Sequence, residues 1–117
     1  MKVIKSQEKN WLEKKGYDKK VLLDGSDLGF PGIVVQEVRI KPGETASVHY
    51  HKKQTEIFYF LDSNGYWLIN GDEYRFSKGD VLVIEPNDRH EVINDTEEDY
   101  EYLAFKLNSE EGDFYED

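Results

Sequence analysis

Between residues 32 and 108 the chain alternates short β-rich runs with clusters of turn residues. The runs are rich in Val, Ile, Phe and Tyr, which favour strands, and the clusters are rich in Gly, Pro, Asn and Asp, which favour turns. Strands that recur about every 8–12 residues are typical of antiparallel sandwiches and barrels. We therefore predict eight strands, over residues 32–41, 45–51, 56–61, 66–69, 73–76, 81–85, 90–94 and 100–107.

The sharpest turn signal is Asn70-Gly71, which separates Trp67-Leu68-Ile69 from the run that contains Tyr74. Asn-Gly is strongly preferred in two-residue type I′ turns, because both central residues of that turn need positive φ angles. The pattern therefore predicts a tight antiparallel hairpin at these two residues.

The predicted strand over residues 56–61 carries apolar side chains on both faces. Successive side chains of a strand point to opposite faces. Phe58 and Phe60 therefore share one face, and Ile57 and Tyr59 share the other. One face can fill a barrel while the other meets a second sheet, the N-terminal helix or another subunit. From this pattern we expect a homodimer.

The N-terminal part of the chain has a different pattern. Residues 6–15 resemble a short helix, because Ser6 can cap the first turn and Gly16 follows the last one. Trp11 and Leu12 would form the buried side of this helix. We therefore expect a short N-terminal helix before the barrel.

A length of 117 residues fits one domain. We divide it into an N-terminal helix and extension (residues 1–31), a β-barrel (residues 32–107) and an acidic tail (residues 108–117). The net charge is −10, and residues 95–117 hold ten acidic residues against Lys106 alone. We interpret this acidic end as a solubilising edge strand and tail rather than as a binding element.

Composition argues against several classes of function. Phosphate backbones attract basic surfaces, so we expect no nucleic-acid partner for so acidic a chain. The absence of cysteine excludes a disulfide, a thiol nucleophile and a thiolate metal site. The longest apolar run, residues 57–61, is far shorter than the ~20 residues that span a bilayer, and no signal peptide is visible. We expect no membrane partner and a cytoplasmic location.

Two of the three histidines form His49-Tyr50-His51 within one predicted strand. Positions i and i+2 of a strand share a face, so the two imidazoles project together, about 7 Å apart along the backbone. Glu56 opens the next predicted strand and is its only charged residue. A carboxylate that points into an aromatic interior is costly unless it is paired or binds a metal. These residues are candidate ligands of a metal ion.

His90 is the third histidine and follows the turn Pro86-Asn87-Asp88. A barrel could bring it across to the other candidate ligands. A lone histidine is more often a hydrogen-bonded structural residue than a ligand, and His-x-His pairs also occur on surfaces by chance. The local pattern therefore leaves a structural role open for these histidines.

The spacing of these residues resembles the cupin superfamily over residues 32–107, and specifically a small single-domain (monocupin) metal-binding protein. The first family motif is Gly, five residues, His-x-His, three or four residues, Glu, six residues and Gly. Here Gly43 is followed after five residues by His49 and His51, and after four more by Glu56. The closing glycine, Gly65, comes after eight residues instead of six.

The second family motif is Gly, five residues, Pro-x-Gly, two residues, His, three residues and Asn. The separations from Gly79 to His90 and from His90 to Asn94 match this motif. The proline, Pro86, falls one place late, and counted from it Asp88 stands at the position of the motif's glycine. We therefore expect an altered turn before His90.

The resemblance implies a double-stranded β-helix, or jelly-roll barrel, with a metal ion near one open end. It implies that the metal ligands are His49, His51, Glu56 and His90. Family sites hold Fe, Mn, Ni, Zn or Cu, and imidazoles plus a carboxylate also suit such ions better than Ca²⁺ or Mg²⁺. On an octahedral ion these ligands would leave positions for water, oxygen or substrate, whereas a closed tetrahedral Zn²⁺ would be structural.

Other residues of the pocket are less sharply marked. Gln36 is the polar exception on an apolar face of the strand over residues 32–41, so it either contacts a ligand or bonds to backbone at the edge of the core. Phe58 and Phe60 share the face of Glu56 and are either pocket wall or core. The catalytic residues stay unknown, with Glu56 and Gln36 as the candidates. Asn94 is interpreted as structural.

Three functions fit these observations. The resemblance implies a small metalloenzyme that acts on a small molecule, as dioxygenases, sugar-related isomerases and decarboxylases of the family do. Dioxygenase-like chemistry is preferred to isomerase-like chemistry, because no base other than Glu56 is evident. The alternative is a non-catalytic module that binds or senses a small molecule. A structural or vestigial metal site is the third.

Overall fold

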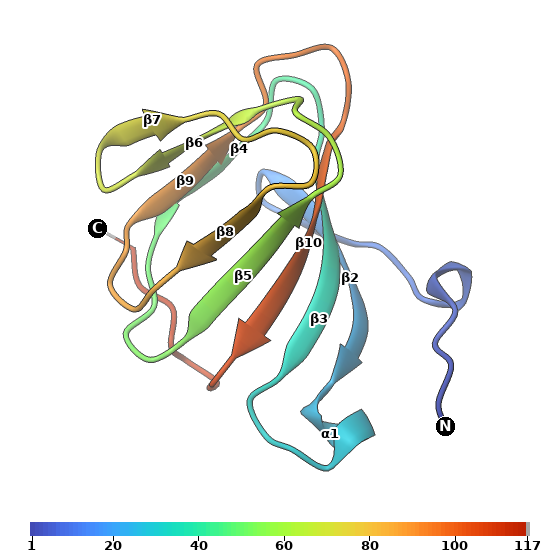
Figure 1. Cartoon of the computed structure of the whole chain (residues 1–117). Coiled ribbons are helices and arrows are strands. Elements are labelled where there is room, and N and C mark those ends of the chain that lie inside the picture. Colours follow the sequence, from blue (N-terminus) through green and yellow to red (C-terminus); the bar gives the residue numbers. More distant parts are fainter. Residues whose placement is uncertain (117) are drawn as a thin grey trace.

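Two antiparallel sheets face each other and enclose the interior of the protein (Figure 1). The computed structural model describes residues 1–116. The larger sheet has the strand order β1-β2-β3-β10-β5-β8, and the smaller sheet has the order β4-β9-β6-β7. The strands are β1 (Leu12–Lys14), β2 (Tyr17–Asp24), β3 (Val34–Ile40), β4 (Thr45–His49), β5 (Thr55–Phe60), β6 (Tyr66–Ile69), β7 (Asp72–Tyr74), β8 (Val81–Ile84), β9 (His90–Ile93) and β10 (Tyr100–Leu107).

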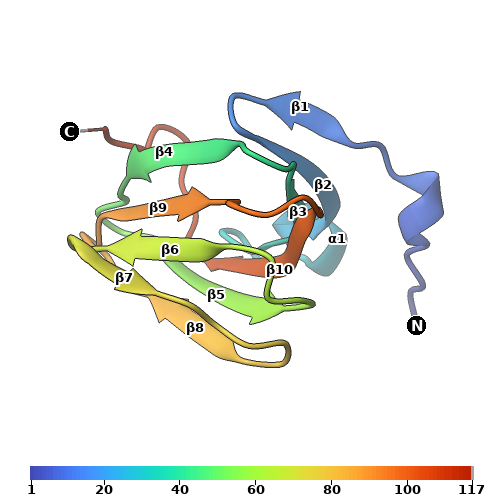
Figure 2. The same cartoon turned by 90° about the horizontal axis from the view of Figure 1, so that it is seen from above.

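From β3 onward the chain passes back and forth between the two sheets. Strands β3, β5, β8 and β10 belong to the larger sheet, while β4, β6, β7 and β9 belong to the smaller one (Figure 2). This winding confirms the prediction of an all-β jelly-roll barrel. It also brings side chains from distant parts of the sequence to the same end of the barrel.

The strands over residues 32–107 lie within two residues of their predicted boundaries. The hairpin between β6 and β7 pairs Ile69 with Asp72. Asn70 and Gly71 both have positive φ angles, of 50° and 89°, as a type I′ turn requires. The turn chemistry of this pair therefore determined the local fold.

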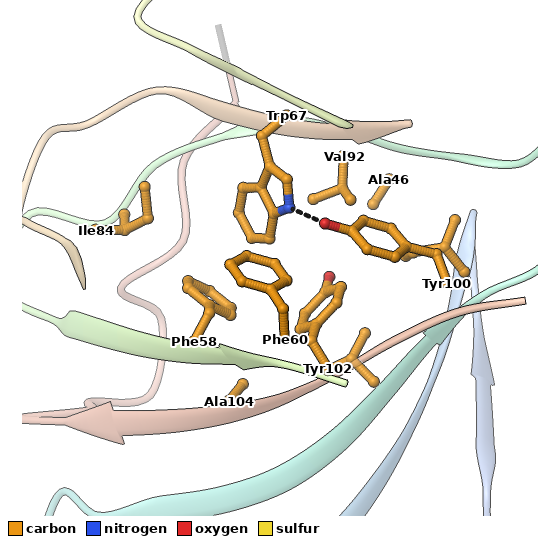
Figure 3. Close-up of a cluster of buried hydrophobic side chains, with 11 residues drawn as sticks. Ala46, Phe58, Phe60, Trp67, Ile84, Val92, Tyr100, Tyr102 and Ala104 are labelled. Atoms are coloured by element: carbon orange, nitrogen blue, oxygen red, sulfur yellow. Dashed lines mark hydrogen bonds between the residues drawn. The ribbon is translucent and has the colours of Figure 1, made fainter. Parts of the chain in front are cut away.

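One end of the barrel, which we call the aromatic end, is filled by Phe60, Trp67, Phe76 and Tyr100. Phe60 and Tyr100 are fully buried, and the rings of Phe60 and Phe76 stack with centroids 4.9 Å apart. The Trp67 indole Nε1 donates a hydrogen bond of 3.1 Å to the Tyr100 hydroxyl (Figure 3). Large aromatic side chains bury much apolar area each, so this end stabilises a small domain effectively.

Asn94 ties the loops together at the aromatic end. Its buried amide Nδ2 donates to the carbonyls of Ile40 and Glu98, at 2.8 and 2.7 Å. Its Oδ1 accepts from the backbone N–H and the hydroxyl of Thr96. These bonds satisfy the whole amide, which fits the structural role expected for this residue.

The predicted N-terminal helix over residues 6–15 is wrong. Only Ser6–Glu8 forms a short 3-10 turn, and Leu12–Lys14 pairs with β2 in an antiparallel hairpin. Hydrogen bonding to β2 outweighs the weak local helix signals. Leu12 is exposed, and Trp11 lies under the guanidinium of Arg39 with 4.1 Å between the group and the ring centroid.

A second short helix, α1 (Gly25–Leu28), joins β2 to β3 and was not predicted. The carboxylate of Asp24 caps it by accepting from the backbone N–H of Ser26, and the carboxylate of Asp27 accepts from the backbone N–H of Asp24. Among residues 1–116, no helix is long and apolar enough to cross a membrane.

The outer face of β5 and β8 stays open to solvent. Tyr59 is 42% exposed, and Val81 and Val83 on the neighbouring strand are 60% and 50% exposed. Tyr59 pairs with Val81 and Ile57 with Val83, so these side chains form one apolar strip. Neither the second sheet nor the N-terminal segment covers it.

Candidate metal centre

The barrel brings four candidate ligands together at the end opposite the aromatic end. One ligand atom from each of His49, His51, Glu56 and His90 lies within 4.8 Å of the other three. His51, Glu56 and His90 are buried. We call this group the His-Glu cluster. It unites all the ligand candidates from the sequence, including His90, which comes from a strand far along the chain from His49.

Strand pairing explains why His90 meets His49. The two residues are direct partners on β4 and β9, and their ring centroids are 4.1 Å apart. Opposed side chains on paired antiparallel strands lie close enough to touch. Glu56 reaches the cluster from the facing sheet, where it pairs with Ile84 on one side and Lys106 on the other.

An irregularity in β4 turns His49 inward. Ala46 pairs with Val92 and His49 with His90, so β4 uses three residues where β9 uses two. In a regular strand, residues three positions apart, such as Ala46 and His49, would face opposite sides of the sheet. With the extra residue, both side chains line the interior cavity. Bulges that redirect one side chain are frequent beside functional sites.

The Nδ1 atom of each imidazole in the cluster lies within hydrogen-bond distance of a backbone carbonyl oxygen. His49 Nδ1 lies 3.0 Å from the Ser47 oxygen, and His90 Nδ1 lies 2.9 Å from the Asp88 oxygen. His51 Nδ1 lies 2.5 Å from the oxygen of Asp113. A carbonyl only accepts, so each Nδ1 carries the proton and each Nε2 keeps its lone pair. This is the usual arrangement around histidines that bind a metal through Nε2.

The charges within the cluster suit a cation. Burial lowers the pKa of His49 to about 4, and neighbouring His90 adds to this effect. Burial also lowers the pKa of His90. Both imidazoles are therefore neutral near pH 7, which is the form that binds metals.

Glu56 and His51 perturb each other in the opposite sense. Burial alone would raise the pKa of Glu56, but His51 and Lys106 outweigh it and lower the pKa, so the carboxylate is ionised. Burial would lower the pKa of His51, but Glu56 and the Asp113 carbonyl overcome that and raise the pKa. His51 Nε2 thus lies beside a negative charge that attracts a proton or a metal ion.

The buried His51 Nε2 atom supports a fit to a metal ion. It lies 3.1 Å from Glu56 Oε1, yet it makes no hydrogen bond. Ligand atoms held about 2.1 Å from an ion lie roughly 3.0 Å apart in cis and 4.2 Å apart in trans. A cluster that spans at most 4.8 Å needs only small side-chain shifts to close around an ion. The donor set of imidazoles and a carboxylate is compatible with a divalent transition metal.

The His-Glu cluster opens into a cavity of about 90 Å³ inside the barrel. Gln36, Phe58 and Lys106 line it, together with Tyr17 and Tyr102. Gln36 is buried, and its Oε1 has no hydrogen-bond partner, so an acceptor faces the cavity unpaired. A second cavity of about 290 Å³ shares His49 and Phe114 with it and is also lined by Lys14 and Lys15.

Sequence reasoning placed some of these residues and missed others. Gln36 and Phe58 line the cavity, but Phe60 does not, because it lies deeper in the aromatic end. Lys106 was interpreted only as a charge in an acidic segment. The signal for it was present: it follows Tyr102 and Ala104 at two-residue spacing on an inward face.

The turn before His90 keeps its geometry with different residues. Counting eight positions from Gly79, the family glycine falls at residue 87 and not at Asp88. Asn87 stands there with a φ angle of 73°. Asn is among the residues that best tolerate this left-handed conformation after Gly. The substitution therefore preserves the turn and leaves His90 in the cluster.

The acidic end of the chain does not lie at an edge. β10 pairs with β3 on one side and β5 on the other, so it is central in the larger sheet. After β10 the chain returns to the His-Glu cluster, where Asp113 is only 8% exposed. The expectation of a solubilising edge strand and tail is therefore wrong, because β10 is a central strand and one carboxylate of the acidic end, that of Asp113, is buried.

Comparison with known families agrees with this geometry. Residues 36–106, more than half of the chain, match the family model described as a Cupin domain. The chain belongs to the cupin family. As a cupin, it carries a His/His/Glu/His group able to hold a metal ion at the position where the two family motifs meet.

Among proteins with curated descriptions, the chain is similar to an oxalate-binding protein from Thermotoga maritima. The two are 30% identical over 67 residues, which cover 57% of this chain and 55% of that protein. The Tetracenomycin polyketide synthase protein TcmJ from Streptomyces glaucescens is 25% identical over 81 residues, which cover 69% of this chain and 54% of that protein. The chain thus spans about half the length of the curated relatives it matches.

A solved structure with the same fold is a predicted oxalate decarboxylase from Thermotoga maritima. The TM-score is 0.77 at 23% sequence identity, and the match covers 91% of this chain and 98% of that chain. Identity this low shows a shared barrel and nothing about the reaction.

Proposed function

We propose that this cupin is a small metal-dependent enzyme that acts on a small molecule carrying an oxyanion or carbonyl oxygen. The observation that carries the proposal is the His-Glu cluster on the wall of a cavity that also contains unpaired polar groups. His49, His51, Glu56 and His90 would hold one divalent transition-metal ion, such as Fe, Mn, Ni, Zn or Cu. When bound, such an ion polarises a substrate oxygen or acidifies a water molecule.

Lys106 and Gln36 support an oxygen-rich substrate. Lys106 provides the positive charge of the inner cavity, and Gln36 offers an amide that can both donate and accept. The cavity of about 90 Å³ favours a compact molecule. The relative named as an oxalate-binding protein has a ligand of this chemical kind. We infer that Lys106 and Gln36 orient the substrate while the ligand cluster positions its reacting oxygen.

The residues of the cavity change the preferred chemistry. The preference for dioxygenase-like chemistry depended on finding no base other than Glu56. Lys106 and the hydroxyl of Tyr17 also line the cavity, and either can move a proton at a bound substrate. Proton-transfer chemistry of the isomerase or lyase type is therefore favoured over oxygen insertion. It predicts activity with Zn²⁺ or Mn²⁺ and without oxygen.

The alternative is a non-catalytic module that binds or senses a small molecule. It uses the same cluster and cavity, and it differs only in the absence of turnover. The observation that favours it is that Gln36 and Lys106 line the cavity and offer hydrogen-bond donors to a small anion without any reaction.

Metal analysis followed by ligand titration tests the proposal. We expect one metal ion per chain by elemental analysis after purification without chelators, and no retained ion in His51→Ala. Small carboxylates and dicarboxylates are then titrated into the metal-loaded protein by calorimetry. Lys106→Gln is expected to weaken anion binding while the metal content stays unchanged, and Lys78→Gln on an exposed loop serves as its control. A protein that takes up none of these metals would overturn the proposal.

We further propose that two copies associate through the apolar strip of Tyr59, Val81 and Val83. Among residues 1–116, strand β8 pairs only with β5 and is the edge of its sheet, so its free edge is open to a second strand. An exposed apolar strip beside an open strand edge fits a second copy of itself across a two-fold axis. Light scattering at micromolar concentration is expected to give the dimer mass, and Val81→Lys is expected to give the monomer mass.

A further inference from the structure

We propose that the C-terminal segment Asp113–Tyr115 is a functional part of the metal centre. In this proposal Asp113 is a positioning residue that fixes His51 as an Nε2 ligand, and Phe114 covers the mouth of the cavity and limits what reaches the His-Glu cluster. The inference rests on the proposed metal site, but the state of His51 can be tested without metal.

Asp113 anchors this segment through its carboxylate. Oδ1 accepts from the backbone N–H of Lys52 at 2.8 Å, and Oδ2 accepts from those of Lys53 and Gln54, both at 3.0 Å. A carboxylate that accepts several backbone N–H bonds is held firmly, since charge-assisted bonds are stronger than neutral ones. These bonds set the loop between β4 and β5, which joins two ligands, His51 and Glu56. In Figure 1 the C-terminal segment runs alongside this loop.

The same residue orients His51 through its backbone. The Asp113 carbonyl receives the proton of His51 Nδ1 at 2.5 Å, which leaves Nε2 directed at Glu56 Oε1. The other two imidazoles find their carbonyls two residues away in sequence, at Ser47 and Asp88. His51 depends on a carbonyl 62 residues away. Only this ligand therefore needs the C-terminal segment in place to have a defined tautomer and ring direction.

Tyr115 holds the segment on the other side of Phe114 through two backbone hydrogen bonds to Tyr50. Its backbone N–H donates to the Tyr50 carbonyl at 3.0 Å and its carbonyl accepts from the Tyr50 N–H at 2.9 Å. The Lys52 ammonium lies 4.2 Å from the centroid of its ring. Tyr50 lies between the two histidines of the first motif, so the segment is fixed on both sides of Phe114.

Phe114 is held over the ligands by these attachments. Its ring stacks on His49 with centroids 4.9 Å apart and meets His51 edge-on at 6.0 Å. It remains 52% exposed, although it contacts these two imidazoles. It lines both cavities, as do Tyr17, Ala46 and His49, so the ring lies where the two cavities adjoin.

The test of Asp113 measures metal affinity and the His51 tautomer separately. Asp113→Ala is expected to weaken Co²⁺ binding about 10- to 100-fold, the usual effect of losing a partner of a metal-binding histidine. Asp113→Asn keeps one acceptor oxygen, so its affinity for Co²⁺ should fall between those of Asp113→Ala and wild type. Glu110→Ala is the matched control, because its carboxylate contacts only the exposed Lys53 side chain at 2.9 Å, and it should change the affinity less than about twofold.

The second measurement uses nitrogen-15 spectra of the imidazoles in metal-free protein. Wild type should show His51 with its proton on Nδ1, and Asp113→Ala should show a mixture of tautomers with His90 unchanged. If the tautomer is unchanged, or if Co²⁺ affinity stays within about twofold of wild type, the positioning role is wrong. If wild type binds no Co²⁺ while the tautomer shifts as expected, the proposed metal function fails and the positioning of His51 stands.

The cover role of Phe114 is tested with probes of two sizes. In Co²⁺-loaded protein, Phe114→Ala should strengthen binding of the bulky ligand benzohydroxamate about tenfold, equivalent to about 1.4 kcal/mol, and change azide binding little. The affinity of Phe114→Leu for benzohydroxamate should fall between those of wild type and Phe114→Ala. Visible absorption of Co²⁺ reports both ligands, and the affinity for Co²⁺ itself should not change. Equal effects on the two probes, or none on either, would refute a size-selective cover.

Discussion

The two ends of this barrel use the same strands for opposite purposes. At the aromatic end, Phe60 and Tyr100 are fully buried and Trp67 finds the Tyr100 hydroxyl as its partner. At the other end, further along the same inward faces, Glu56 and Lys106 bring charge into the interior. The inward faces of these strands are thus apolar at one end of the barrel and polar at the other.

The comparison teaches where stability and chemistry reside. Buried aromatic rings contribute to folding whether or not a ligand is present. The buried carboxylate of Glu56 adds charge rather than apolar contacts, and its partners His51 and Lys106 compensate its burial. Changes at the aromatic end should therefore lower stability and leave metal binding intact, and changes at the His-Glu cluster should do the reverse.

The largest effect is expected from Phe60→Ala. Removing a fully buried ring should lower the free energy of unfolding by about 3–5 kcal/mol, because the core loses contacts and a cavity remains. Urea denaturation measures this loss. Tyr59→Ala is the control, since that side chain points outward from the same strand and is 42% exposed. If the folded variant also loses metal affinity, the two ends are not separable.

Glu56→Gln should show the opposite pattern. Metal affinity is expected to fall about 100-fold, or about 2.7 kcal/mol, because the ion loses its only anionic ligand. In the presence of a chelator the variant should lose only a modest amount of stability, because His51 and Lys106 favour the charged carboxylate over a neutral group. Calorimetric titration and urea denaturation give the two values. Glu73→Gln, at an exposed position on β7, should change neither. A large loss of metal-free stability would contradict the assignment.

Acid should destabilise the metal-free protein through His49. Its pKa is lowered from 6.5 to about 4, so the unfolded chain takes up this proton first. The stabilising contribution is complete above pH 6.5 and is lost as the pH falls toward 4. Urea denaturation at several pH values measures the slope. His49→Gln should flatten it, whereas an unchanged slope would assign the effect to other groups of the cluster.

The smallest effect is expected from Tyr100→Phe. The Trp67 indole N–H would lose its acceptor inside the aromatic end, which costs about 1–2 kcal/mol. Thermal denaturation should detect the loss, and metal affinity should not change. Tyr74→Phe, on an exposed ring, is the control. Equal melting temperatures for the two variants would mean that water replaces the missing hydroxyl.

Most strands of the barrel could be predicted from the sequence, because turn residues and alternating apolar positions are local signals. Turn residues such as Asn70-Gly71 fix hairpins within a few positions, and alternation places Phe58 inside. The candidate ligands His49, His51 and Glu56 were indicated by a local pattern, two imidazoles at two-residue spacing followed by an isolated carboxylate, and His90 was added by the spacing of the second family motif. The cytoplasmic location stays a prediction.

The features that sequence reasoning missed depend on distant partners. Leu12–Lys14 becomes a strand because β2 is available to pair with it. Asp113 is one of many acids in an acidic segment, and only the folded chain shows that three backbone N–H groups surround its carboxylate. No local pattern distinguishes it from its neighbours.

The extra residue in β4 has a consequence for how this family can change. His49 faces the interior because β4 uses three residues from Ala46 where β9 uses two. Deleting Ser47 or Val48 would leave His49 two residues from Ala46, so a regular ladder would keep both side chains inside and His49 opposite His90. A single-codon deletion at this point should therefore retain the His-Glu cluster. The bulge thus lets the strand beside the candidate site vary in length by one residue without loss of a candidate ligand.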